Sequence, residues 1–173
     1  KTAYEISLGL VGSEMCIRDS HTGPLAYVGF MTGGRHSHLD SAGYSYDQKF
    51  LGKGLPDPEE AGRMLFKEEA WRQVLNSLIV CLFARKIYDA ETVSKALKAV
   101  GVERTPEELE KLGVGTLRLR HGFKAREGFD PKGLRIPRRI LETRSPHGRI
   151  DLEYLKKAVE AYFREASTSG SLG

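Results

Sequence analysis

The sequence predicts an all-α, multi-helix domain with long site-lining loops. Apolar residues recur at three- and four-residue steps along several stretches, which is the spacing of one buried face of an α-helix. Two helix starts carry capping signals: Asp57 stands directly before Pro58, and Thr105 is followed three residues later by Glu108. No stretch shows a convincing β-hairpin pattern. These observations together favour a helical fold over a mixed one.

The first long helix is expected to start at Asp57 and to continue, with a break near Asn76, to about Tyr88. Its apolar stripe consists of Leu65, Trp71, Val74, Leu75, Leu78, Ile79, Leu82 and Phe83. A second helix is expected from Asp89 or Thr92 to Gly101.

A third helix follows the Thr105 capping box, and Gly113 and Gly115 are expected points of interruption in it. Residues 131–137 are expected to form a loop. The last helix opens at Ile150–Leu152, and its buried stripe is Leu152, Leu155, Val159, Tyr162 and Phe163.

The chain divides into three parts. Residues 1–20 resemble a translated sequencing-adapter tail and are expected to lie outside the native fold; read without that resemblance, Tyr4–Val11 would be a short strand. Residues 21–166 form the helical domain, and within it residues 21–56 are expected to be an irregular, Gly- and His-rich loop with at most short helical turns. Residues 167–173 are expected to be a flexible tail.

Composition excludes several classes of protein. With 40% hydrophobic and 29% charged residues the chain is an ordinary globular one, and no apolar stretch is long enough to predict a membrane span. Two cysteines and no secretory signal favour a reducing cytoplasm over a disulfide scaffold. The net charge of +4 permits an acidic partner without requiring one.

Three features could carry chemistry. Cys81 lies in an apolar helix, where a lone cysteine is usually a small buried hydrophobe. His36 and His38 flank Ser37 in a polar Gly-rich loop, which suits a general acid or base. Histidines that are merely solvated in a surface loop would show the same sequence pattern. The third feature is a basic run, which would fit a nucleic-acid-binding or scaffold domain. Acidic residues within the run instead favour a solvated helix face or a docking surface for an acidic protein. The basic residues are Arg118, Arg120, Lys124, Arg126, Lys132, Arg135, Arg138 and Arg139, and the acidic ones are Glu127 and Asp130.

Three stretches in order resemble the C-terminal domain of the aldehyde:ferredoxin oxidoreductase family. They are GRHSHLD through Gly43-Tyr44, NSLIVCLF at 76–83, and FKAREGF at 123–129 followed by LRIPR at 134–138. The resemblance extends from about His21 to Arg164. It implies that the chain is a truncated piece of such an enzyme, inactive without the missing N-terminal domains.

The resemblance also implies roles for individual residues. The family pattern Asp-x-x-Gly-Leu-Cys falls on residues 76–81. Cys81 then corresponds to the last of four thiolate ligands of a [4Fe–4S] cluster, and Asn76 stands where the family has an Asp that hydrogen-bonds a pterin. Ile79 and Val80 replace the Gly and Leu, so Val80 is expected beside the cofactor. His36 or His38 corresponds to the residue that handles protons near the metal.

The implied reaction is the oxidation of an aldehyde to a carboxylic acid by water. Electrons would leave a tungsten- or molybdenum-bis-pterin centre through the cluster to ferredoxin. No nucleic-acid or membrane partner is expected. The 126–129 stretch is expected to be structural, with Arg126 pairing with Glu127 and with Phe123 and Phe129 packing under the final helices.

Overall fold

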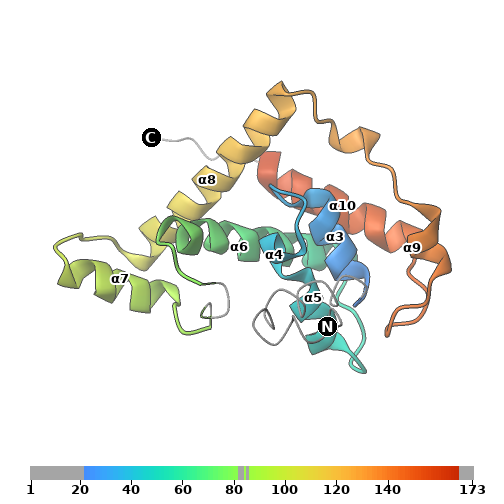
Figure 1. The fold of residues 1–173 in the computed structure, drawn as a ribbon, viewed down its shortest axis with the longest axis horizontal. Helices are drawn as coiled ribbons and strands as arrows, with labels where there is room; N and C mark the ends of the chain where they lie inside the picture. Colours follow the sequence, from blue (N-terminus) through green and yellow to red (C-terminus); the bar gives the residue numbers. More distant parts are fainter. Residues whose placement is uncertain (1–21, 82–83, 85, 168–173) are drawn as a thin grey trace, which may run out of the picture.

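In the computed structural model, residues 22–81, 84 and 86–167 are described, and this part of the chain is helical (Figure 1). It contains no β-strand, only an isolated bridge between Ser145 and Gly148. The predicted all-α class is therefore confirmed. The elements are α3 Pro24–Thr32, α4 His38–Ser41, α5 Gly43–Phe50, α6 Pro58–Ser77, α7 Ala90–Ala99, α8 Pro106–Arg126, the 3-10 turn η4 Pro131–Gly133, α9 Arg138–Glu142 and α10 Leu152–Ser167.

The central helix is α6, which packs against α10 on one side and α8 on another (Figure 1). The main core forms where these helices meet α3. Its largest fully buried apolar side chains are Leu25, Leu65, Leu117, Leu155 and Tyr162. A smaller core joins the end of α6 to α7 and α8 through Leu75, Val93 and Leu109. None of the described helices is long and apolar enough to cross a membrane.

Local capping signals placed the helix starts correctly. Asp57 accepts a hydrogen bond from the backbone N–H of Glu59 at the start of α6, and Asp89 accepts one from Thr92 at the start of α7. At α8 the capping box of Thr105 and Glu108 is complete in both directions. These predictions are confirmed because each cap uses partners only two or three residues away.

Helix α8 runs without interruption through Gly113 and Gly115, so the expected break there was wrong. The reason at Gly113 is close packing: a Cβ at this position would lie 2.3 Å from the carbonyl oxygen of Ala70 on α6. Gly113 therefore permits the approach of two long helices at the cost of its own helix propensity.

Substituting Gly113 with Ala should destabilise the fold by about 1–3 kcal/mol, because the added methyl group forces α6 and α8 apart. Gly122 on the same helix is the matched control, since a Cβ there meets nothing within 4 Å. Gly122→Ala should stabilise by up to about 1 kcal/mol through helix propensity alone. Urea unfolding of both variants measures the difference, and equal effects at the two glycines would contradict the packing argument.

The N-terminal part differs from the sequence expectation. Residues 24–50, predicted as an irregular loop, contain α3, α4 and α5. Helix α3 shows no helical stripe because it is apolar nearly all round, with six of its nine residues buried. Its first turn is capped from a distance: the carboxylate of Asp47 accepts from the N–H of Leu25 at 3.0 Å and of Ala26 at 2.9 Å. A cap supplied from α5 leaves no local signal.

The expected helix from Asp57 to about Tyr88 is also corrected. Helix α6 ends at Ser77, and the described residues between it and Asp89 contain no further α-helix. The end is a Schellman motif: the Val80 N–H donates to Leu75 O at 3.0 Å and the Ile79 N–H to Asn76 O at 3.1 Å. Ile79 takes the left-handed conformation that this motif requires, with φ of 57°.

The expected N-terminal strand or adapter tail (residues 1–20) and residues 168–173 of the expected C-terminal tail lie outside the described residues. Their assignment stays a prediction.

Candidate functional site

A short turn between α3 and α4 carries the predicted proton-handling histidine. His36 has φ of 53°, in the left-handed region, and its exposed ring shares a hydrogen bond from Nδ1 with the Phe30 carbonyl oxygen at 2.9 Å. The same ring lies 5.4 Å from the ring of Phe129 (centroid to centroid). His38 is the first residue of α4, and its side chain lies outside the described part of the structure.

Asp40 organises this turn from inside. Its carboxylate, 3% exposed as a residue, accepts hydrogen bonds from the backbone N–H and the Nε of Arg35, both at 2.8 Å. The Arg35 guanidinium also lies 2.7 Å from Oδ1 in an ion pair. Ser37 and Asp40 complete a capping box at α4. The Arg-His-Ser-His-Leu-Asp stretch is thus an ordered turn rather than an open loop.

The helices beneath the turn hold it by polar contacts. The carboxylate of Glu69 on α6 accepts from the Gly34 N–H at 2.7 Å, and Lys124 on α8 donates to the Gly33 carbonyl at 3.1 Å. Arg72, one helical turn after Glu69, donates to the Leu39 carbonyl. Two helices far from the turn in sequence therefore fix its backbone on both sides of His36.

A buried hydrogen-bonded chain continues from Glu69. The hydroxyl of Tyr162 on α10 donates to Glu69 at 2.5 Å, and Nε2 of His121 on α8 lies 3.2 Å from that hydroxyl. Burial raises the pKa of Glu69, against the hydrogen bonds from Gly34 and Tyr162 that lower it. Burial, together with the charges of Lys124 and His36, lowers the pKa of His121 to about 4, so this imidazole is neutral at pH 7.

The other predicted site residues lie at the far end of α6. Asn76 is exposed in the last turn, seven residues after Glu69, which places it about 10 Å further along the helix axis. Val80 is half-buried against the smaller core, and Cys81 follows it as an exposed free thiol. Among the described residues, no hydrogen bond or ring contact joins His36 to Asn76 or Cys81, and their meeting at one concave face stays a prediction.

The Schellman turn explains the spacing of the 76–81 motif. The family pattern has Gly at the position of Ile79, which is the residue that adopts the left-handed conformation here. Glycine reaches this conformation without strain, whereas a β-branched residue does so at a cost. The turn therefore gives Ile79 a conformation for which glycine, the residue of the family pattern, is better suited.

Replacing Ile79 with Gly should raise the free energy of unfolding by about 1 kcal/mol, because it removes the left-handed strain. Little burial is lost, since Ile79 is 92% exposed. Ile79→Val is the control, because Val is equally β-branched and should leave stability unchanged. Thermal unfolding of the two variants checks this, and a destabilised Gly variant would contradict the strain argument.

Two further features differ in part from expectation. Phe129 packs as expected: its ring centroid lies 6.1 Å from that of Phe163, and the Lys124 Nζ lies 4.0 Å from the centroid of the Phe129 ring. Phe123, which was also expected to pack, is 56% exposed. In the basic run, Lys124 and Arg118 donate to backbone carbonyls of other elements. These two cations therefore serve the fold rather than an exposed nucleic-acid surface.

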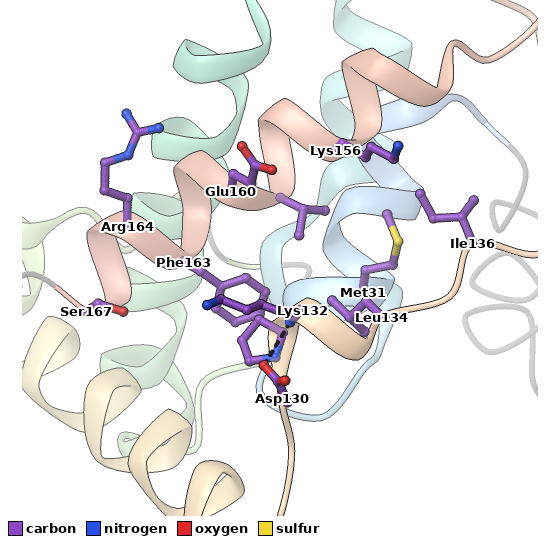
Figure 2. Close-up of a pocket in the computed structure, with 12 residues that line it drawn as sticks. Met31, Asp130, Lys132, Leu134, Ile136, Lys156, Glu160, Phe163, Arg164 and Ser167 are labelled. Carbon is purple, nitrogen blue, oxygen red and sulfur yellow. Dashed lines mark hydrogen bonds between the residues drawn. The ribbon is translucent and has the colours of Figure 1, made fainter.

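An open groove of about 620 Å³ lies next to Phe163, between α10, the end of α3 and the segment after α8 (Figure 2). Its apolar wall includes Met31, Leu134, Ile136, Val159 and Phe163, and its rim carries charges of both signs. No sequence pattern indicated this groove, because its walls come from three separate segments.

Sequence reasoning missed Glu69 and His121, and it placed Lys124 only in the basic run, without its contact to the turn. A signal existed for Glu69: it lies four residues after Leu65, on the buried face of α6, where an acid requires partners. The described residues hold no group of three or more His, Cys, Asp or Glu side chains placed to bind a metal ion.

Comparison with known proteins supports the resemblance of the motifs. The family model described as "Aldehyde ferredoxin oxidoreductase, domains 2 & 3" matches residues 2–167. Neither the curated proteins nor the solved structures gave a match. Because the family model covers almost the whole sequence, the chain belongs to the aldehyde ferredoxin oxidoreductase family, as a piece of its second and third domains.

Proposed function

We propose that the chain is part of an enzyme that oxidises aldehydes to carboxylic acids with ferredoxin as electron acceptor. The observation that carries this is the 76–81 turn: within a family match over residues 2–167, it presents an exposed cysteine thiol four residues after the end of α6. The parent enzyme would work in a reducing cytoplasm, where such a thiol stays available as a ligand.

The residues present fit one corner of a [4Fe–4S] site. Cys81 can supply one thiolate, and such clusters are held by four. Because the sequence contains only two cysteines, at least two ligands would have to come from residues outside it. Asn76 can accept and donate a hydrogen bond toward a pterin, but without the charge of a carboxylate. Val80 would close the site from the apolar side.

The chemistry divides between the cofactors and this chain. A tungsten- or molybdenum-bis-pterin centre and the cluster would supply the redox chemistry and the electron path to ferredoxin. The oxidation of an aldehyde by water also releases protons, and His36 would accept and pass on one of them. Its Nδ1 is held by the Phe30 carbonyl, which leaves Nε2 as the nitrogen that exchanges the proton.

The test is metal analysis and turnover of the parent enzyme purified without oxygen. Iron together with tungsten or molybdenum, and aldehyde-dependent reduction of ferredoxin, are the expected results. The 173-residue chain alone should show no turnover. A parent protein without these metals, or one that binds nucleic acid and reduces no ferredoxin, would refute the proposal in favour of a basic scaffold domain.

A further inference from the structure

We propose that Glu69 is the positioning residue for His36, acting through the backbone of Gly34 from inside the fold. The inference rests on the proposed role of His36 in proton transfer. It is carried by the contacts of a side chain that lies on another helix, 33 residues away in sequence.

The contact is direct and buried. Glu69 is 0% exposed, and its Oε1 accepts from the Gly34 N–H at 2.7 Å, two residues before His36. The turn passes so close that a Cβ on Gly34 would lie 3.3 Å from this oxygen. A hydrogen bond to a carboxylate is among the stronger ones in a protein, so it limits the backbone position tightly.

Glu69 is itself prevented from moving. Its second oxygen receives the Tyr162 hydroxyl at 2.5 Å, and Tyr162 is fully buried between Phe66 and His121. Lys124 donates to the Gly33 carbonyl, which belongs to the same peptide group as the Gly34 N–H. The peptide group between Gly33 and Gly34 is therefore held at its N–H and at its C=O by charged side chains from α6 and α8.

Such fixing matters because His36 has a backbone conformation that L-residues seldom adopt. With φ of 53°, it would relax toward negative φ if the turn were free. Uncommon conformations of this kind persist when the surrounding structure over-determines them. Release would swing the ring away from Phe129 and from the Phe30 carbonyl, its two present contacts.

The chemical identity of Glu69 supports a positioning role. Burying a carboxylate costs free energy, and an apolar residue would fill this face of α6 with less penalty. Asp40 faces the same space with a like charge, and Lys124 faces it with the opposite one. The Glu69 carboxylate accepts one hydrogen bond from the turn and one from α10, and in this way it connects the two segments.

The experiment compares Glu69→Met with Glu69→Gln in the isotope-labelled chain. Met has a similar length but accepts no such hydrogen bond, whereas Gln keeps an acceptor oxygen for Gly34. Glu91→Met is the control, because Glu91 is exposed on α7. NMR follows hydrogen exchange of the Gly34 amide and the ring shifts of His36 next to Phe129.

In Glu69→Met, exchange at Gly34 should be about ten- to a hundredfold faster, and the His36 ring shifts should move toward those of a free histidine. In Glu69→Gln both should stay close to wild type. Unchanged His36 shifts in Glu69→Met would overturn the proposal. If that variant does not fold, Tyr162→Phe takes its place: it should move the His36 shifts in the same direction, and no movement would overturn the proposal equally.

The same variants in the parent enzyme separate positioning from mere stability. Glu69→Met should lower kcat by up to about a hundredfold with KM and metal content unchanged, and Glu69→Gln should restore most of it. A parent enzyme without aldehyde oxidation would refute the proposed function, while the NMR result would still decide whether Glu69 positions the turn.

Discussion

Cys81→Ser in the parent enzyme should abolish ferredoxin-linked aldehyde oxidation and lower the iron content, while the helical fold stays in place. The fold is expected to survive because Cys81 is exposed after the end of α6 and contributes nothing to the cores. A serine oxygen is a harder and poorer ligand for iron than a thiolate. Iron analysis, the cluster's electronic spectrum and turnover measure the effect.

The matched control is Val100→Ser, which introduces the same residue at an exposed position. Val100 is 75% exposed at the end of α7, so its substitution should change neither iron nor turnover. Full iron content and full activity in Cys81→Ser would end the assignment of this residue as a cluster ligand. Far-UV circular dichroism of the chain verifies that the helices are retained.

His36→Ala should lower kcat by about a hundredfold or more, with iron and tungsten or molybdenum content unchanged. The physical reason is the loss of a positioned acid–base group, while the backbone contacts of Gly33 and Gly34 remain. His36→Asn is a second variant that tolerates the left-handed conformation and lacks an acid–base group of suitable pKa. It should show the same loss.

His38→Ala is the comparison for this prediction, because the sequence pattern offers both histidines. Steady-state kinetics of the two variants across pH separate them. A large kcat effect at His38 and none at His36 would move the proton-transfer role to α4. Equal, small effects at both would remove it from this turn altogether.

The structural features that the sequence could predict are those formed between residues close together along the chain. The starts of α6, α7 and α8 were predictable because Asp57, Asp89 and Thr105 cap partners two or three residues away. The end of α6 was only partly predictable. A break near Asn76 was expected, but the Schellman turn has an isoleucine where a glycine would have signalled it.

The candidate site shows the same division. The ordered motifs alone indicated the family and pointed to Cys81, Asn76 and His36, because a motif survives as a string of residue types. The surroundings of His36 left no such string: its turn is held by Glu69 and Lys124, and Glu69 in turn by Tyr162, 93 residues further on. From the sequence, Tyr162 was predicted only as one residue of the buried stripe on the last helix.

The sequence by itself thus determined the helical class, the positions of the locally capped helices and the family. Tertiary structure alone decided that Pro24–Thr32 forms a helix, because Asp47 caps α3 across 21 and 22 residues of chain. It also decided where the buried acids lie and what they hold. The physical reason is that a buried carboxylate can persist only beside its donors, and folding, not sequence proximity, brings those donors to Asp47 and Glu69.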